Sequence, residues 1–321
     1  MTTRVFSRRL AAITVTVALA VAAAGCSSST TSSGSPHGKA SVDASGGTFP
    51  VTVAAANGPV HIAKRPTSII SLAPSATEML YAVGAGSQVK AVDQDSNYPA
   101  QAPTSSLSGL TPNIEAIVAD KPDLVVVSYD AATLTKRLAQ FSIPVLSLPA
   151  PADVNGVYSE LTQLGQATGD QQQAAAEVTR LRSEIRQVVA AVPHHAKPLT
   201  YYYELDQTYY SVTSSTFIGR LLGLLGMKSI ADTAKGAAAA GGYPQLSSEY
   251  IVKANPDYVI LADTICCHQD AAKVAARPGW AGLAAVKAHH VIALNDDIAS
   301  RWGPRVVDLL RAVLAGIRGG K

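Results

Sequence analysis

Two stretches of this sequence decide the fold: residues 113–127 read NIEAIVADKPDLVVV, and residues 247–261 read SSEYIVKANPDYVIL. Each begins as a short helix with a glutamate in its first turn, breaks at a Pro-Asp pair, and continues as an apolar, largely β-branched run. Such a run, bounded by a turn signal, is typical of a parallel-sheet strand that is buried on both faces. The repetition predicts two similar α/β lobes. The alternative is two unrelated βα units in one α/β domain.

The N-terminus has the features of an export signal. Three arginines within the first nine residues precede an apolar run, Leu10 to Ala24, that is too short to span a bilayer. Residues 23–26, AAGC, resemble the bacterial lipobox, in which the cysteine thiol receives lipid and becomes the first residue. We therefore expect residues 1–25 to be a lipoprotein signal peptide and Cys26 to be lipidated. An ordinary secretory signal is the alternative.

The charge of the chain belongs mostly to this signal. Residues 1–25 hold three arginines and no acidic residue, so the formal net charge of +3 falls to about zero once they are removed. The adjacent Arg8 and Arg9 leave open whether export is of the Sec or the twin-arginine type. No cluster of Lys and Arg lines up on one face, so nothing indicates a nucleic-acid partner.

The chain divides into segments by composition and period. At 321 residues it is long enough for two lobes with separate cores. Residues 26–48 are rich in Ser, Thr and Gly, which predicts a flexible tether. We expect an N-terminal lobe over 49–168 and a C-terminal lobe over 194–321. Apolar residues at spacings of three and four predict a long helix over 169–193 that joins the lobes; a crossover helix within one domain is the alternative.

The predicted fold class is therefore α/β, with two Rossmann-like lobes, parallel central sheets, one long connecting α-helix and a ligand cleft between the lobes. In such sheets ligands bind at the carboxyl ends of the strands. Side chains expected at those ends are mostly aromatic or polar, suited to a bulky ligand held by burial and a few hydrogen bonds. The candidate ligand-binding residues are Ser75, Tyr98, Tyr129, Tyr243, Asp297, Arg301 and Trp302. Ser75 is also expected to form a capping box with Glu78.

Motifs for catalysis or metal binding are missing from the sequence. It contains no P-loop, no G-x-S-x-G, no H-E-x-x-H and no G-x-G-x-x-G after a strand, so we expect no catalytic residues. Cys266 and Cys267 are adjacent and could form a vicinal disulfide or remain a thiol pair. With His268 they lack the usual spacing of metal ligands, so we expect no metal site. An enzyme on a similar α/β frame and a metal chaperone remain rival classes.

From about Pro66 to Ile317 the sequence resembles the helix-linked substrate-binding proteins of ABC importers for vitamin B12, ferric siderophores and haem. The resemblance lies in residues 69–78 (IISLAPSATE), 113–115 (NIE), 121–124 (KPDL) and the closing Arg301 with Gly303-Pro304-Arg305. It implies two lobes joined by one rigid helix, with the ligand in the cleft.

The resemblance also implies partners. In the family one exposed glutamate on each lobe docks on the permease, and Glu115 and Glu249 match those positions. We therefore expect a monomer that is anchored by its lipid to the extracytoplasmic face of the cell membrane. It would deliver a small-molecule ligand to a permease and its ATPase. Both glutamates could instead simply favour a helix N-terminus.

For the ligand, the resemblance favours a corrinoid. Asn97-Tyr98-Pro99 and Asp297 are similar to the vitamin B12-binding branch, where a tyrosine and an aspartate line the cleft; Tyr243 stands where that branch has tryptophan. Arg301 could instead hold an anionic siderophore by charge-assisted bonds. Haem is a third alternative, since cleft tyrosines could ligate its iron. The protein itself is expected to hold no cofactor, and its ligand to be a metal chelate: cobalamin, a ferric siderophore or haem.

Overall fold

The computed structural model describes residues 41–42, 47–129 and 132–319. The expected signal peptide, the lipidated Cys26 and most of the expected tether lie outside these residues. Within the tether segment, strand β1 (Ser41–Val42) pairs with β2 (Thr48–Phe49). A second antiparallel hairpin follows, formed by β3 (Val51–Ala55) and β4 (Gly58–Ile62).

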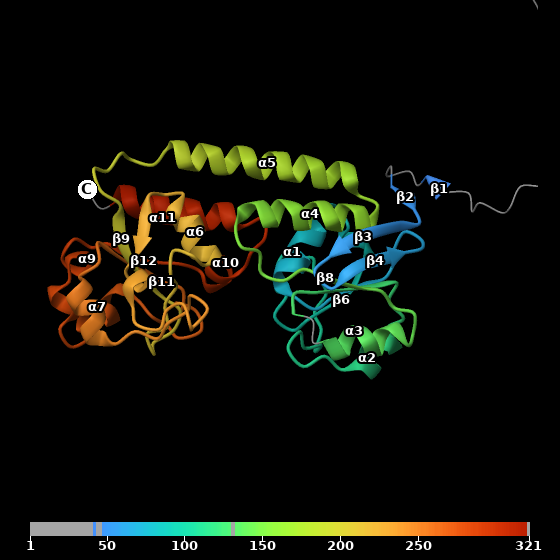
Figure 1. The fold of residues 1–321 in the computed structure, drawn as a ribbon, viewed down its shortest axis with the longest axis horizontal. Coiled ribbons are helices and arrows are strands. Elements are labelled where there is room, and N and C mark those ends of the chain that lie inside the picture. Colours follow the sequence, from blue (N-terminus) through green and yellow to red (C-terminus); the bar gives the residue numbers. More distant parts are fainter. Residues whose placement is uncertain (1–40, 43–46, 130–131, 320–321) are drawn as a thin grey trace, which may run out of the picture. The chain divides into compact units, whose positions relative to one another are not determined.

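The first half of the chain forms a four-stranded parallel sheet (Figure 1). Its strands, in spatial order, are β6 (Val89–Val92), β5 (Ile69–Ser71), β7 (Leu124–Val127) and β8 (Val145–Ser147). All three neighbouring pairs are parallel. The third strand in sequence, β7, is therefore an inner strand, as its continuous apolar run predicts.

The second half repeats this arrangement in a separate sheet. Its strands, in spatial order, are β10 (Met227–Ser229), β9 (Leu199–Glu204), β11 (Tyr258–Leu261) and β12 (Val291–Ala293). These pairs are also all parallel. Across each sheet the strands have the same order, which is second, first, third and fourth by their place in the sequence. The α/β fold class with two parallel sheets is confirmed.

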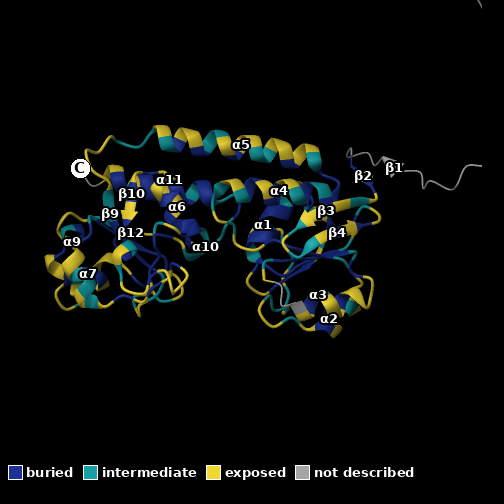
Figure 2. Cartoon of the chain, in the orientation of Figure 1, coloured by how far each residue is buried: buried dark blue, intermediate teal, exposed yellow. Residues whose placement is uncertain are grey.

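Helices cover both faces of each sheet, as the burial in Figure 2 shows for the strands. In the first lobe, Val125 and Val127 of β7 pack with apolar residues of two helices, and Leu124 and Val126 pack with those of two others. The first pair of helices is α2 (Ile114–Ala119) and α3 (Ala132–Ala139), and the second is α1 (Pro74–Ala82) and α4 (Val154–Thr168). Successive side chains of β7 point to opposite faces of the sheet, and all four are buried. The strand therefore contributes to one core on each face.

The second lobe uses the same alternation on β11. Val259 and Leu261 share a core with one group of helices, and Tyr258 and Ile260 share a core with another. The first group is α7 (Ser248–Ala254), α8 (Ala271–Ala276) and α9 (Ala284–Lys287); the second is α6 (Phe217–Gly223) and α11 (Val306–Gly319). The remaining elements are η1 (Gly86–Gln88), η2 (Ile230–Thr233), η3 (Trp280–Gly282) and α10 (Asp296–Ser300).

Helix α5 (Gln171–Ala190) lies between the two sheets in sequence and is 20 residues long. It packs against α4 and α11, and its Leu181, Ile185 and Val188 belong to a core cluster with residues of both sheets. Gly169, with φ of 82°, turns the chain from α4 into α5 in a left-handed conformation that favours glycine. The residue boundaries predicted from the sequence for the two lobes and the connecting helix remain predictions.

The repeated Pro-Asp pair has the same structural role in both lobes. Asp123 Oδ2 accepts hydrogen bonds of 2.9 Å from both N and Oγ1 of Thr67. Asp257 Oδ2 accepts equivalent bonds, of 2.8 and 2.7 Å, from N and Oγ1 of Thr200. Each aspartate thus joins the start of the third strand to the start of the first. The sequence repeat is therefore a repeat of one strand-start contact.

No helix in the described ranges has both the length and the apolar character needed to cross a membrane.

Replacing Asp257 by alanine should remove two charge-assisted hydrogen bonds and leave the half-buried amide of Thr200 unpaired. We expect the free energy of unfolding to fall by about 1.5–3 kcal/mol, and Asp123→Ala to act in the same direction. Urea denaturation measures this change. The control is Asp120→Ala, which removes an exposed acid just before the Lys121-Pro122-Asp123 segment and should change stability by less than about 0.5 kcal/mol. Equal effects of Asp257→Ala and Asp120→Ala would contradict the assigned role.

Candidate functional site

A pocket of about 670 Å³ opens at the carboxyl ends of the strands in the first sheet. This is the edge at which open α/β sheets bind ligands. Residues that follow β5, β6, β7 and β8 line it, together with residues of α10 and the segment after it. The lining residues are Leu72, Ala73, Pro74, Ser75, Asp93, Asp95, Gly109, Leu110, Ser128, Tyr129, Pro149, Ala150, Asp297, Ser300, Arg301 and Trp302.

The pocket is apolar with an acidic component. Among the lining residues, three are aspartates and one is an arginine, while most of the others are aliphatic, proline or aromatic. The size falls within the range of about 300–1,000 Å³ that is usual for small-molecule sites. The lining therefore suits a large ligand of neutral or positive charge.

Arg301, the only cation among these lining residues, uses both terminal nitrogens of its guanidinium to bind other residues of the protein. Its Nη1 donates to Glu78 Oε1 at 3.1 Å and to Asn97 Oδ1 at 2.8 Å. Its Nη2 donates to the carbonyl oxygen of Asp95 at 3.0 Å and to Asp297 Oδ1 at 2.6 Å. These bonds occupy the four N–H groups of the two terminal nitrogens. Arg301 thus holds the pocket wall together, and an anionic ligand would have to displace one of its present acceptors.

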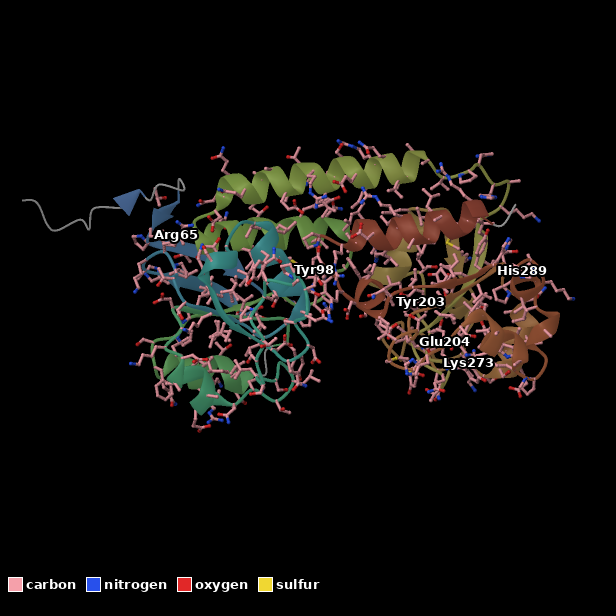
Figure 3. All side chains as sticks on the ribbon, turned by 180° about the vertical axis from the view of Figure 1, so that it is seen from behind. Arg65, Tyr98, Tyr203, Glu204, Lys273 and His289 are labelled. Carbon is pink, nitrogen blue, oxygen red and sulfur yellow. The ribbon has the colours of Figure 1, made fainter. Side chains whose placement is uncertain are left out.

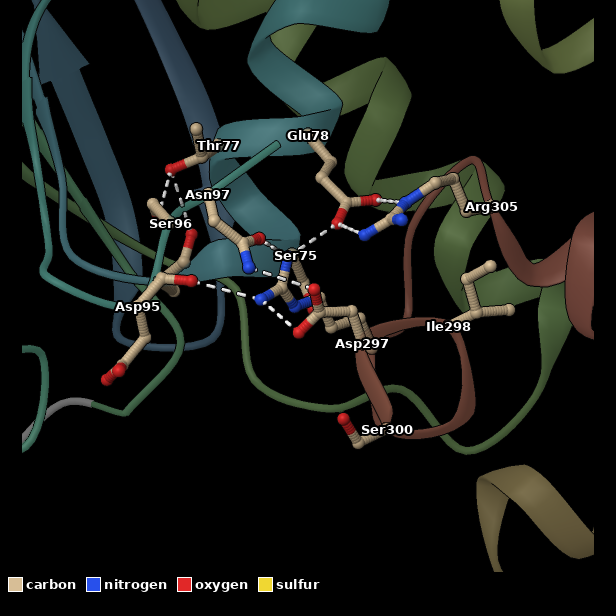
Figure 4. A network of polar contacts seen from close by, with 12 residues as sticks. Ser75, Thr77, Glu78, Asp95, Ser96, Asn97, Asp297, Ile298, Ser300 and Arg305 are labelled. Carbon is tan, nitrogen blue, oxygen red and sulfur yellow. Dashed lines mark hydrogen bonds and ion pairs between the residues drawn. The ribbon is translucent and has the colours of Figure 1, made fainter. Parts of the chain in front are cut away.

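Glu78 links α1 to the segment that leads into α11. Its side chain is buried, and besides Arg301 it accepts from Arg305, whose Nε lies 2.9 Å from Oε2. One carboxylate thus receives two guanidinium groups from the far half of the chain. Figure 4 shows Glu78 on α1 facing Arg305. Breaking such a buried pair leaves an uncompensated charge, so this contact is costly to separate.

The capping box expected at Ser75 and Glu78 is wrong. The N-cap of α1 is Ala73 in extended conformation, without a side-chain cap, and Pro74 is the first helical residue. Ser75 lies one residue inside the helix, where its Oγ accepts from the backbone N of Trp302 at 3.2 Å. Proline is favoured at the first helical position, where no amide partner is needed, and the helix starts two residues earlier than the capping box predicts. Glu78 is consequently free to bind the arginines.

Tyr98, Asp297 and Trp302 surround this network. The Arg305 guanidinium lies 4.1 Å from the centroid of the Tyr98 ring, a cation–π arrangement. Tyr98, labelled in Figure 3, is not among the residues that line the pocket. Asp297 Oδ2 accepts from Asn97 Nδ2 at 2.9 Å. The buried Nε1 of Trp302 has no hydrogen-bond partner among the described residues, which leaves one donor beside the pocket for a ligand or a water.

The two remaining tyrosines have different settings. Tyr129 lines the pocket directly after β7 and is 68% exposed, so a large aromatic surface is open to a ligand. Tyr243 precedes α7 in the second lobe and is not among the lining residues of this pocket. Partial burial raises the pKa of Tyr243, which keeps its phenol protonated at neutral pH. The structure therefore brings together Ser75, Tyr129, Asp297, Arg301 and Trp302, with Tyr98 beside them and Tyr243 apart.

Sequence reasoning missed several lining residues. Leu110 is 82% exposed in the pocket wall, and a side chain at Gly109 would overlap the carbonyl oxygen of Leu72. Gly109 is therefore needed for the close approach of two backbones. A Gly-Leu pair in a loop carries no chemical signature. Asp93 had a signal, since it directly follows β6; burial raises the pKa of its carboxyl, which Ser96 partly offsets by donating a hydrogen bond.

Glu115 and Glu249 occupy equivalent positions, each the second residue of the helix before the third strand. The N-cap side chains are Asn113, which accepts from Ala116 N, and Ser247, which accepts from Tyr250 N. Both glutamates are exposed, and Arg137 lies 3.6 Å from Glu115. The Glu249 backbone amide and then Ser247 lower the pKa of the Glu249 carboxyl, which is thus ionised at neutral pH. Each lobe presents one surface carboxylate at the start of a helix.

Cys266 and Cys267 are free thiols whose sulfur atoms lie 2.7 Å apart. Across the described residues, no group of three or more His, Cys, Asp or Glu side chains is placed to hold a metal ion.

Comparison with known proteins agrees with this fold. The family model described as "Periplasmic binding protein" matches residues 69–298. The chain belongs to the periplasmic binding protein family, the substrate-binding proteins of ABC transporters.

Relatives include proteins with and without a stated ligand. An uncharacterized ABC transporter substrate-binding lipoprotein of Bacillus subtilis strain 168 is 30% identical over 270 residues, which cover 81% of this chain and 83% of that protein. A cobalamin-binding protein of Halobacterium salinarum is 30% identical over 271 residues, 81% of this chain and 72% of that one.

Solved structures of similar fold carry several ligand names. A possible iron-binding periplasmic protein from Staphylococcus epidermidis ATCC 12228 has a TM-score of 0.69 at 26% identity, covering 79% of this chain and 99% of its own. The periplasmic vitamin B12-binding protein of Vibrio cholerae has a TM-score of 0.64 at 24% identity, covering 79% and 98%. The second likeness shows the fold alone.

Replacing Glu78 by alanine should leave the Arg301 and Arg305 guanidinium groups without their shared carboxylate. Because these groups are largely buried, we expect a loss of about 3–5 kcal/mol in the free energy of unfolding. The surface acid Glu184, which also accepts from two arginines, is the matched control. Glu184→Ala should cost at most about 1 kcal/mol. Chemical denaturation of both variants decides the matter, and a loss at Glu78 no larger than at Glu184 would contradict the account.

Proposed function

We propose that this protein captures a corrinoid of the cobalamin type outside the cytoplasm and delivers it to the permease and ATPase of an ABC importer. The carrying observation is the charge of the pocket lining: three aspartates, with the single arginine already bonded to four acceptors. Membership in a family of substrate-binding proteins supports the general activity, and the charge of the pocket lining supports the proposed ligand. Nothing in this role requires turnover.

Charge complementarity supports a corrinoid over the other metal chelates. Cyanocobalamin carries no net charge and bears amide groups around its rim, which can donate hydrogen bonds to carboxylates. Haem carries two propionates, and ferric siderophores of the catecholate type are anionic, so either would bring negative charge towards Asp93, Asp95 and Asp297. Like charges in a cleft of low polarity repel strongly and select against such ligands.

Shape and exposed apolar surface support the same choice. Leu110 and Tyr129 are the most exposed large hydrophobic residues of the described chain, and both line the pocket. Exposed apolar surface in a concave site is typical of ligand binding. A broad macrocycle can cover both side chains. The names of relatives from Halobacterium salinarum and Pectobacterium atrosepticum, cobalamin-binding and vitamin B12-binding protein, give independent support.

A ferric siderophore or haem is the second candidate, favoured by the Tyr129 phenol. Tyr129 lines the pocket, and tyrosine is an established ligand of haem iron. The similar Staphylococcus epidermidis structure is described as possibly iron-binding. In either case the metal would arrive as part of the ligand, and the protein would hold no cofactor of its own.

Delivery would use the two surface glutamates. Glu115 and Glu249 stand at equivalent places on the two lobes, so a permease with two cationic patches could bind both at once. Interfacial charge pairs couple by about 1.5–7 kcal/mol when they are desolvated, which is enough to set the register of docking. A lipid on Cys26 would keep the monomer at the extracytoplasmic face of the membrane. The lipoprotein name of the Bacillus subtilis relative supports this anchor.

Cyanocobalamin, haemin and an anionic ferric catecholate should be compared by thermal shift. At a ligand concentration of 100 times Kd, binding stabilises the native state by about 2.7 kcal/mol. We expect the shift with cyanocobalamin alone. Tyr129→Ala should weaken cyanocobalamin binding by about 1.5 kcal/mol, roughly ten-fold in Kd, because an apolar contact is lost. The control is Phe141→Ala, which removes an exposed aromatic outside the pocket. A shift with haemin or the siderophore instead would favour the second candidate; a shift with none would contradict both.

The double variant Glu115→Ala, Glu249→Ala should bind ligand as the unchanged protein does but fail to support import. The physical reason is the loss of two docking charges that do not touch the pocket. Uptake of radiolabelled cyanocobalamin into cells that depend on this protein measures the effect, with a double variant of surface acids outside these helices, Glu184→Ala with Asp308→Ala, as control. Normal uptake by the Glu115, Glu249 variant would remove the docking role.

A further inference from the structure

The loop after β11 carries two of the three cysteines of the chain, and the proposed function makes no use of them. Cys266 is exposed and Cys267 is half-buried, with their sulfur atoms 2.7 Å apart. The loop begins at the carboxyl end of a strand, on the edge of the second sheet where α/β proteins bind ligands. Both thiols are therefore accessible to small molecules and already adjacent to each other.

Asp296 connects this loop to the ligand pocket. Its carboxylate accepts from Cys266 N at 2.8 Å, from Ile265 N at 3.0 Å and from Thr264 Oγ1 at 3.2 Å. Asp296 is the first residue of α10, a helix of five residues. The next residue is Asp297, and Arg301 follows the helix; both line the pocket. A change in the backbone of the cysteine loop therefore acts directly on the element that carries two pocket residues.

The rest of the loop is a tight turn. The backbone N atoms of Cys267 and Gln269 both lie 3.3 Å from the carbonyl oxygen of Asp263. His268 has φ of 51°, a left-handed conformation that is uncommon for a residue with a side chain. Its carbonyl oxygen accepts from Lys273 Nζ at 2.6 Å. Hydrogen bonds to Asp263 and Lys273 thus fix the turn at both ends. A change in the backbone at the cysteines therefore also affects the residues bonded to them, such as Asp296.

We propose that Cys266 and Cys267 form a thiol–disulfide exchange site that external disulfides oxidise, and that the resulting bond between neighbouring residues loosens the hold of Asp296 and weakens ligand capture. The effect on ligand rests on the proposed function; the oxidation and the loosening do not. Disulfides form readily outside the cytosol, which is where the proposed function places the protein.

The chemistry balances as two thiol–disulfide exchanges. The Cys267 thiolate attacks one sulfur of a small-molecule disulfide, forms a mixed disulfide and releases one thiol, which takes the proton that Cys267 gave up. Cys266 then attacks the Cys267 sulfur, closes the Cys266–Cys267 bond and releases the second thiol with the second proton. The two cysteines lose two electrons, and the external disulfide gains them.

The order of attack follows from the surroundings of the two thiols. Although Cys266 is an exposed residue, partial desolvation of its thiol, then hydrogen bonding to Cys267 and the nearby Asp296 carboxylate, raise the pKa of this thiol to about 12. Cys266 therefore stays protonated at neutral pH and is the poorer first nucleophile, because the thiolate is the attacking species. In the second step the attack is intramolecular, and the short distance between the sulfurs offsets its low thiolate content.

Closing the bond must disturb the backbone at Cys266. Neighbouring Cα atoms lie about 3.8 Å apart across a trans peptide, whereas disulfide-linked residues usually have their Cα atoms about 4.4–6.8 Å apart. The ring that closes contains the peptide group between the two cysteines. Torsions on both sides of it have to change, and the Cys266 N–H that binds Asp296 is attached to a ring atom. Oxidation therefore weakens that hydrogen bond.

The test uses the full chain with Cys26→Ser, so that the pair supplies the only thiols. The protein is incubated with reduced or oxidised glutathione, alkylated and measured by intact mass spectrometry. We expect the oxidised sample to lose two hydrogen atoms and to accept no alkyl group. Two alkyl groups, or a lasting mixed disulfide with glutathione, would overturn the exchange site. Cys266→Ser is the matched control and should stop at the mixed disulfide.

The coupling to α10 is measured on the same samples. Oxidation should lower the thermal midpoint by roughly 2–4 °C and raise Kd for cyanocobalamin about five-fold, a loss of affinity below one decade. In Asp296→Asn, whose amide holds the loop more weakly, both differences should shrink. A disulfide that forms with no change in midpoint would overturn the coupling. If the reduced chain binds no cyanocobalamin, the proposed ligand fails, and the midpoint alone still decides the coupling.

Discussion

The structure depends on one buried carboxylate. Glu78, on the first helix after the first core strand, binds Arg301 and Arg305, which lie more than two hundred residues later in the sequence. The Arg301 side chain in turn binds Asn97, Asp95 and Asp297, so a single ionic network forms one wall of the pocket. Ionic groups that are buried and mutually satisfied hold a defined geometry, because any shift leaves a charge without a partner. The same network engages the one arginine that lines the pocket, and this is why we propose a ligand without net negative charge.

Repetition organises the rest of the chain. Both sheets have the same strand order, both carry an aspartate that joins the third strand to the first, and both place a glutamate at the start of the helix before that strand. The two aspartates serve folding. The two exposed glutamates have no structural partner of comparable strength, although Glu115 lies near Arg137. The repeat thus includes surface residues as well as residues that stabilise the fold. This is consistent with the proposal that both lobes contact the same partner protein.

Local pattern in the sequence predicted the fold well and the site partially. The apolar runs at 124–127 and 258–261 predicted buried parallel strands, and apolar residues at spacings of three and four predicted a long helix over 169–193, where α5 lies. Side-chain pairing was not predictable, because it joins residues far apart: Glu78 was assigned to a capping box, and nothing local to Arg301 revealed that four acceptors surround it. Gly109 and Leu110 were missed for another reason, since close backbone approach leaves no chemical signature in a loop. Tyr243 follows an Ala/Gly-rich loop and lies outside the pocket.

The central claim is that the acidic, aromatic pocket held by Glu78 and Arg301 is where a neutral corrinoid binds. Hydrogen–deuterium exchange with and without saturating cyanocobalamin tests it most directly. The account predicts slower exchange in residues 72–75, 93–110 and 297–302, with little change along α5. Unchanged exchange in those three segments, or protection confined to surfaces away from them, would contradict it.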